Sequence, residues 1–297
     1  MIADELVLAP ADATKRSLRR VLRWLLKLTR RKPTMVAGIL FVLAMAIMSI
    51  AAPLFTSQDP NRLTPADRLQ GPSAEHWFGT DQVGRDVYSR TVFGGRVSLI
   101  VGFSVAALTM TLGSVIGLMT GYYRKVDAVV MRFLDGLMAF PTVLLAIALV
   151  AMLGASMTNV IVALVVVSFP REVRIIRASV LSLREQQFVE AARAMGAPVW
   201  RILAFHIFPS TVPTLIVQGT FTVSIAILTE AILSFLGAGT SPHIASWGNM
   251  MAEGNYFVQI AIWMILFPGI ALGLTVMGVS LAGDGLRDVL DPRISGS

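Results

Sequence analysis

The chain has 297 residues, of which 55% are hydrophobic and only 14% are charged, and its mean hydropathy is +0.71. Soluble domains carry roughly 45–50% apolar and about 25% charged residues, so this composition excludes an ordinary soluble protein. The absence of cysteine excludes disulfides, thiolate metal sites and a cysteine nucleophile. Of the 25 Lys and Arg residues, nine precede residue 33. This asymmetry is typical of a cytoplasmic tail, and it explains the net charge of +7 better than a nucleic-acid partner does.

Long charge-free stretches predict an all-α integral membrane protein with six transmembrane helices, since about 20 apolar residues cross the hydrocarbon core. A polar Gly-Ala-Ser-Met-Thr-Asn turn at 154–159 divides the longest stretch into two helices. Pro141 and Pro268 should kink or interrupt the third and sixth helices, because proline lacks a backbone donor. The predicted spans are 34–54, 97–121, 129–153, 158–178, 211–236 and 257–282.

The distribution of Lys and Arg near the span ends predicts the orientation. Basic residues fill the tail and the loop between the fourth and fifth spans, so both are expected in the cytoplasm, whereas 56–96 and 237–256 are expected outside. The predicted units are a basic cytoplasmic tail (1–32), the first helix with an external segment (33–96), a five-helix core (97–283) containing a cytoplasmic loop (180–209), and a cytoplasmic carboxyl tail (284–297).

Glycines spaced by four residues predict helix-contact surfaces, because they leave bare backbone on one helix face. Gly113, Gly117 and Gly121 form one such face in the second span, and Gly269 with Gly273 forms another in the sixth. The spacing leaves open whether each face contacts this chain or another subunit.

Glu230 is predicted to be the only carboxylate well inside a span. A buried acid is a default candidate for function, but its place one or two turns from the external end favours bonding between helices. We therefore keep Glu230 out of the candidate binding residues. The three histidines, His76, His206 and His243, are too far apart in the sequence to build a metal site.

The loop at 180–209 is predicted to form two short helices. Ser182 and Glu185 have the spacing of a capping box, and Gly196 followed by Pro198 indicates a helix stop and a restart. The first helix has a narrow apolar stripe that suits docking into a groove on a partner. Packing on the chain's own membrane domain is an equal alternative. The stripe consists of Phe188, Ala191, Ala192 and Met195.

The same loop resembles a known family. Glu190-Ala191-Ala192, three residues, Gly196, nine residues and then His206-Ile207-Phe208-Pro209 is similar to the cytoplasmic Glu-Ala-Ala loop of binding-protein-dependent ABC importer permeases. A His before the Ile resembles the dipeptide, oligopeptide and nickel branch. Segments 76–99, 233–251 and 283–293 resemble the same branch.

This resemblance implies a type I ABC importer permease fold and the C-type subunit of a permease pair in a prokaryotic cytoplasmic (inner) membrane. The expected partners are a second homologous permease, two ATPase subunits or one fused ATPase, and an external solute-binding protein. ATP and Mg would be used by the ATPases, and this chain would bind no cofactor or metal. The cargo would be di- or oligopeptides or a similar small solute. The residues implied for ATPase coupling are Glu190, Ala191, Ala192, Arg193, Gly196 and Pro209.

Two functions from other classes compete with this interpretation. A self-sufficient secondary transporter needs buried ion-coupling groups and usually two related halves, whereas the sequence offers an isolated Glu230 and no evident repeat. An intramembrane enzyme needs a catalytic constellation, and the sequence indicates no converging nucleophile, base and acid. The sequence has no phosphate-binding loop of the G-x-x-x-x-G-K-[S/T] type, so we do not expect this chain to hydrolyse ATP.

Overall fold

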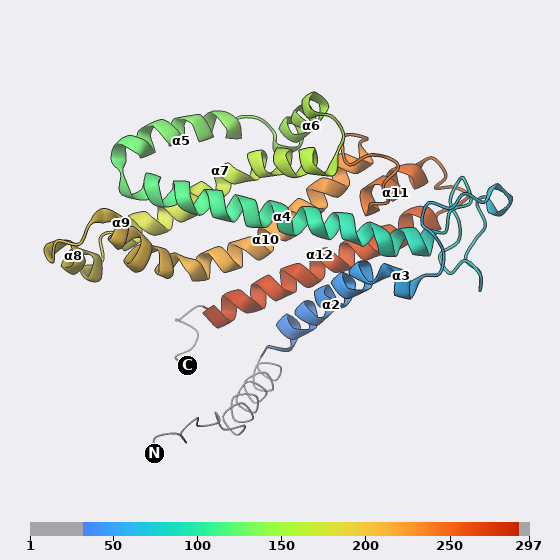
Figure 1. Ribbon diagram of the computed structural model, residues 1–297, viewed down its shortest axis with the longest axis horizontal. Coiled ribbons are helices and arrows are strands. Elements are labelled where there is room, and N and C mark those ends of the chain that lie inside the picture. Colours follow the sequence, from blue (N-terminus) through green and yellow to red (C-terminus); the bar gives the residue numbers. More distant parts are fainter. Residues whose placement is uncertain (1–31, 291–297) are drawn as a thin grey trace, which may run out of the picture.

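The computed structural model describes residues 32–290, and helices make up almost all of its regular structure. The long helices α2, α4, α7, α10 and α12 run lengthwise beside one another, and short helices lie at the two ends (Figure 1). The helices are α2 (Pro33–Ile50), α3 (Ala52–Phe55), η1 (Pro65–Asp67), α4 (Val87–Tyr122), α5 (Arg124–Met138), α6 (Thr142–Leu153), α7 (Met157–Leu183), α8 (Gln187–Ala194), α9 (Val199–Ile202), η2 (Leu203–Ile207), α10 (Phe208–Phe235), α11 (Trp247–Asn255) and α12 (Trp263–Leu290).

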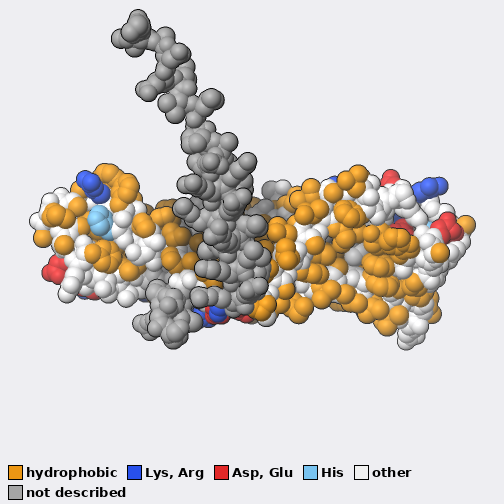
Figure 2. Space-filling view, turned by 90° about the horizontal axis from the view of Figure 1, so that it is seen from below, with side chains coloured by type: hydrophobic (Ala, Val, Ile, Leu, Met, Phe, Trp, Pro, Cys, Tyr) orange, Lys and Arg blue, Asp and Glu red, His pale blue; other side chains and the backbone are white. Residues whose placement is uncertain are grey.

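The two ends of the molecule are distinct, and we name them by their short helices. The α8 end holds α8 and α9, and the α11 end holds residues 56–86 and 236–262 (Figure 1). In the view of Figure 2, apolar side chains cover much of the flank between the ends, and charged side chains gather mainly near the ends. This distribution is the one expected of a protein whose middle lies in a bilayer.

Four helical stretches within residues 32–290 are long and apolar enough to cross a membrane, and a fifth is gained if α5 and α6 count as one bent span. They are α2, α4, residues 199–235 and α12. The remaining predicted span corresponds to α7, whose middle carries Arg171, Glu172 and Arg174. A helical membrane protein is therefore confirmed, while the count of six crossings stays a prediction.

Helix α4 is longer than the predicted span. It begins at Val87, where the Asp86 side chain accepts a hydrogen bond from the backbone N–H of Ser89 at 2.7 Å. Its 36 residues extend over about 54 Å at 1.5 Å per residue, far more than the roughly 30 Å hydrocarbon core. Arg90 and Arg96 therefore mark the end of the apolar stretch but do not end the helix.

The two prolines behave differently. Pro141 separates α5 from α6, whose axes differ by 90°, as the sequence predicted for the third span. Pro268 does not interrupt α12, which is continuous from Trp263 to Leu290. This helix starts after the predicted residue 257, because residues 256–262 form turns, and it continues past residue 284, where a tail was expected. Residues 1–31 of the expected basic tail and 291–297 lie outside the described residues.

The glycine face of α4 packs against α7 within the same chain. A Cβ added at Gly113, Gly117 or Gly121 would lie 2.7, 2.6 or 2.5 Å from the Cβ of Glu172, Ile176 or Val180, respectively. These distances are shorter than any ordinary carbon contact, so the close approach requires glycine. The predicted contact surface on α4 is confirmed, and it is internal. Gly273 on α12, in contrast, faces no described atom within 4 Å.

Glu230 lies fully buried in α10 and makes two side-chain hydrogen bonds. Its carboxylate accepts from Ser98 at 3.1 Å and from Ser234 at 2.8 Å. Ser98 belongs to α4, so the carboxylate joins two helices. This geometry agrees with the structural interpretation of Glu230.

Candidate coupling surface

The segment after α7 differs from the predicted capping box. Helix α7 continues to Leu183, so Ser182 lies in its last turn and cannot cap the next helix. Glu185 instead pairs with the neighbouring Arg184 at 3.0 Å. Helix α8 begins after Gln186, which makes no side-chain capping bond. The predicted capping box is therefore wrong, because the helix that precedes it is longer than expected.

The predicted stop at Gly196 is confirmed. The Gly196 N–H donates to the Arg193 carbonyl at 3.0 Å, and the Ala197 N–H donates to the Ala192 carbonyl at 3.1 Å. These two bonds, with φ of +77° at Gly196, form a Schellman motif. Pro198 then precedes α9 as its N-cap residue. This turn fixes the direction of α9 relative to α8.

The apolar stripe of α8 divides between two faces. Val189 and Ala192 are buried in a cluster with residues of α7 and α10, whereas Phe188 and Met195 are 43% and 81% exposed. Ala191 is exposed beside them. The helix therefore packs on its own membrane domain through one row of side chains and presents the adjacent row outward. Packing on the chain's own membrane domain is therefore observed, Ala192 belongs to this inner row, and docking of the outer row on a partner stays a prediction.

Helix α9 is not a separate element. A π-helical turn, η2, joins it to α10, so residues 199–235 form one helical stretch of 37 residues. Trp200 and Phe205 lie in this connection, 64% and 65% exposed, with ring centroids 6.1 Å apart. Exposed aromatic side chains gathered at one end of a chain indicate a contact surface.

We call the exposed apolar residues of this end the coupling surface; they are Phe188, Ala191, Met195, Trp200 and Phe205. Glu190 and Arg193 are exposed on the same helix, Gly196 forms the turn, and Pro209 lies in the first turn of α10. Of the residues expected to couple to the ATPase, Ala192 alone is buried, and the others are exposed.

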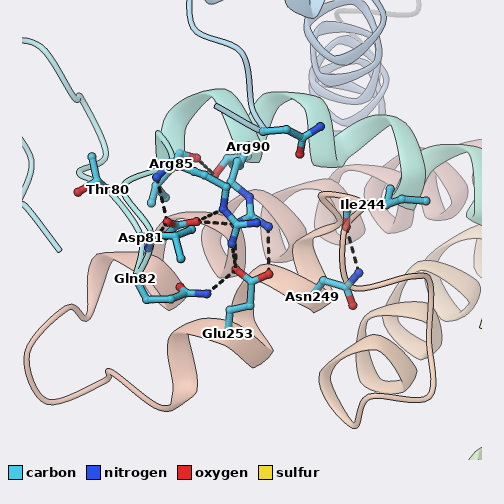
Figure 3. A network of polar contacts seen from close by, with 12 residues as sticks. Thr80, Asp81, Gln82, Arg85, Arg90, Ile244, Asn249 and Glu253 are labelled. Atoms are coloured by element: carbon cyan, nitrogen blue, oxygen red, sulfur yellow. Dashed lines mark hydrogen bonds and ion pairs between the residues drawn. The ribbon is translucent and has the colours of Figure 1, made fainter. Parts of the chain in front are cut away.

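The α11 end is held by a buried ionic network (Figure 3). Arg90 is 1% exposed, and its guanidinium donates to Asp81 at 2.5 Å and to Glu253 at 2.8 Å. Arg85 also donates to both carboxylates, at 2.5 and 2.6 Å, and Gln82 donates to Glu253 at 3.3 Å. Two positive and two negative charges therefore balance one another. The network joins the segment before α4, the first turn of α4, and α11.

Comparison with known proteins decides the family. Residues 109–296 match the family described as "Binding-protein-dependent transport system inner membrane component". The chain is 43% identical over 269 residues to the dipeptide transport system permease protein DppC of Alkalihalophilus pseudofirmus, covering 90% of this chain and 88% of the relative. The chain belongs to this family.

Other relatives of the permease support this assignment. The permease is 39% identical to the probable D,D-dipeptide transport system permease protein DdpC of Escherichia coli K12 over 92% of this chain and 91% of the relative. The permease is 41% identical to the glutathione transport system permease protein GsiD of Pectobacterium atrosepticum, covering 89% of this chain and 88% of the relative. The permease is therefore an inner-membrane transport subunit of an ABC importer.

A solved structure shares the fold of the permease. A chain from the inward-facing MetNI methionine ABC transporter superposes with a TM-score of 0.55 at 21% sequence identity, covering 68% of the permease and 96% of that chain. The expected ABC importer permease fold is confirmed by this likeness. Within residues 32–290, no group of three or more His, Cys, Asp or Glu side chains is arranged to hold a metal ion.

Proposed function

We propose that this permease is the C-type subunit of a peptide importer and that it forms the translocation pathway with a second, homologous permease. The observation that carries the cargo class is the similarity, over about nine-tenths of the chain, to permeases named for dipeptide, D,D-dipeptide and glutathione transport. Dipeptides and glutathione are small molecules that contain peptide bonds. An external solute-binding protein delivers the cargo, and cytoplasmic ATPases, separate or fused, supply the energy from ATP and Mg.

The coupling surface is the proposed contact with an ATPase. Its support is the exposed row on α8 with Trp200 and Phe205, which leaves a large apolar area uncovered at one end of the chain. Glu190 and Arg193 flank this row and are suited to polar contacts at its rim. The inner row, Val189 and Ala192, anchors α8 to α7 and α10. Movement of the ATPase would therefore reach the membrane helices directly.

Continuity of the helix from α9 to α10 supports a mechanical role for this contact. A displacement at Trp200 is transmitted along a single stretch, residues 199–235, without an intervening flexible loop. Rigid-body movement of helices around the pathway would then expose the cargo alternately to the two sides of the membrane.

Reconstitution tests the function. The complex of both permeases and the ATPases, in vesicles supplied with the binding protein, should take up a radiolabelled dipeptide in a vanadate-sensitive reaction. The chain alone should not transport, because half a pathway and one ATPase contact do not complete a cycle. Ion-driven uptake by the isolated chain would instead establish the secondary-transporter alternative.

Labelling tests the proposed orientation, with the α8 end and both termini in the cytoplasm. Because the native chain contains no cysteine, single cysteines can replace the exposed Ser73 and Ser182. An impermeant thiol reagent added to intact spheroplasts should label the first variant only. Labelling of the second variant alone would reverse the orientation.

A further inference from the structure

A second buried carboxylate lies in the membrane part of the chain, and the sequence did not single it out. Glu172 of α7 is 1% exposed. One of its oxygens, Oε1, accepts a hydrogen bond from the Thr222 hydroxyl at 2.7 Å, but the other, Oε2, is buried without a hydrogen-bond partner in the described structure. The Gln218 side chain lies near the carboxylate without meeting hydrogen-bond geometry to Oε2. An orphaned carboxylate oxygen is costly and calls for a donor.

The surroundings of Glu172 form a cavity of about 190 Å³. Its walls come from the break between α5 and α6, from the middle of α7 and from α10. At 1.5 Å per residue, Glu172 lies about 22 Å from the start of α7 and about 16 Å from its end, so the cavity lies beside the middle of this helix. The polar residues of the lining are Thr142, Ser168, Arg171, Glu172, Gln218 and Thr222.

The broken helix beside the cavity is a second, independent feature. Met138, Phe140 and Thr142, which flank the break, all line the cavity. Non-helical backbone at membrane depth is tolerated where it borders a cavity or is buried in protein. In membrane transporters, such breaks and intramembrane charges mark the positions where a polar ligand replaces the missing partners.

The charges of the lining define the ligand. Arg174 and Arg177 of α7 pair with Asp135 and Asp127, whereas Arg171 forms no ion pair with another residue of the described range. The cavity therefore offers an unpartnered carboxylate oxygen of Glu172, and Arg171, whose charge attracts this carboxylate, is part of the same lining. A free peptide carries the complementary pair, an ammonium and a carboxylate. The volume is below the roughly 300–1,000 Å³ of pockets for drug-sized ligands, so it suits a very small peptide or one end of a longer one.

We propose that this cavity is a cargo-contact site in which Glu172 binds the amino terminus of the transported peptide. The proposal rests on the proposed peptide transport and adds to it a selection step inside the permease. The Oε2 atom accepts a hydrogen bond from the cargo ammonium, while Oε1 stays held by Thr222. Arg171 attracts the cargo carboxylate at the exposed side of the cavity. Opening of the wall at the α5–α6 break admits the cargo.

The test compares uptake of a dipeptide with uptake of the same dipeptide acetylated at its amino terminus, by the reconstituted complex with saturated binding protein. Selection by the binding protein is the same for every permease variant, so it cancels when ratios are compared. Glu172→Gln keeps an acceptor for Thr222 but loses the charge. It should lower uptake of the free dipeptide about tenfold, the loss expected for one charge-assisted hydrogen bond, and leave the acetylated peptide unchanged.

Glu230→Gln is the matched control, because it makes the same change at a buried carboxylate that lies outside the cavity and has partners on both oxygens. Its ratio of free to acetylated uptake should equal that of the unaltered complex. An unchanged ratio in Glu172→Gln, including an equal fall for both peptides, would show that Glu172 has only a structural role. A complex that transports no peptide even without substitutions would overturn the proposed function itself.

A second measurement leaves Glu172 in place, so it decides the matter even if the Gln variant fails to assemble. Ser168→Cys puts a single thiol in the cavity lining of a chain without native cysteine. During turnover, the free dipeptide should slow alkylation of this thiol severalfold more than the acetylated peptide does. Equal protection by the two peptides would contradict binding of the amino terminus here.

Discussion

The two ends of the molecule differ in how their charged and aromatic side chains are accommodated. At the α11 end, Arg85 and Arg90 are balanced by Asp81 and Glu253 inside the chain, and Trp247 is buried with its indole N–H donating to the Thr91 carbonyl at 2.9 Å. At the α8 end, Trp200 and Phe205 are exposed. A buried tryptophan stabilises the fold, whereas an exposed one is available for contact with another molecule. The charges of the α11 end are thus balanced within the chain, although Trp77 and Tyr256 are 62% and 85% exposed there, and the α8 end leaves the coupling surface uncovered.

The substitution expected to have the largest effect on stability is Arg90→Met. The substitution leaves Asp81 and Glu253 short of a buried counter-charge, which should cost about 3–5 kcal/mol of stability. Thermal unfolding of the detergent-solubilised complex should show a clearly lower midpoint. Arg68→Met is the matched control, since Arg68 is exposed at the same α11 end and its replacement should change stability by no more than about 0.5 kcal/mol. Equal midpoints for the two variants would mean that the network does not hold the α11 end together.

Adjacent alanines on α8 separate the inner row from the outer one. Arginine at the buried Ala192 forces volume and charge into the cluster beneath α8, so we expect a loss of roughly 3 kcal/mol and poor assembly of the permease pair. Arginine at the exposed Ala191 should leave the pair intact but prevent ATPase binding. Subunit ratios on a gel after co-purification distinguish the two. Full ATPase content in Ala191→Arg would remove the coupling surface from the mechanism.

The same substitution, glycine to valine, can be compared at two positions, one at each end of the molecule. Gly196 and Gly237 both have φ of +77°, and neither has a described atom within 4 Å of an added Cβ. Valine at either position should cost about 1–2 kcal/mol through backbone strain alone. Only Gly196→Val should also uncouple ATP hydrolysis from uptake, because only that turn sets the angle between α8 and α9. The measurement is the number of ATP molecules hydrolysed per peptide imported; equal ratios in the two variants would contradict a special role of the α8 end.

The smallest expected effect concerns Lys32 and Asp288, which pair at 2.6 Å where the start of α2 meets the end of α12. Their side chains are 29% and 45% exposed, so solvent screens the pair. Lys32→Gln should change the unfolding midpoint by the equivalent of about 0–1 kcal/mol. A loss as large as that of Arg90→Met would show that burial is not what makes the network at the α11 end important.

Several features encoded in local spacing were predicted correctly, although the capping box at Ser182 and Glu185 and an interruption at Pro268 were not found. The glycines on α4 gave a contact face, Gly196 gave a helix stop, and Pro141 gave a break, because each depends on what a single residue does to its own backbone. Helix lengths were predicted less well. The sequence shows where a stretch stops being apolar, but α4 and α12 continue beyond that point as solvent-compatible helix.

Features that depend on distant residues were missed. Nothing in the sequence pairs Arg90 with Glu253, which are joined only when α4 and α11 meet. The choice of row on α8 was also beyond a periodic pattern, since Ala191 and Ala192 are both apolar and a helix rotation of one residue, about 100°, exchanges them. Glu172 was missed because arginines on both sides made the end of the predicted span 158–178 resemble a membrane interface. The intramembrane charge rule could have identified it.

The π-turn η2 sets an angular register between the two parts of the longest helical stretch. Ile202 and Ile207 are five residues apart and both buried, a spacing that one π-turn, but not an α-turn, brings toward a common face. Deleting a single residue from 203–207 would restore an ordinary α-helix in which the two isoleucines are four residues apart and still share a face. The π-turn thus accommodates one extra residue without changing the direction in which Trp200 faces.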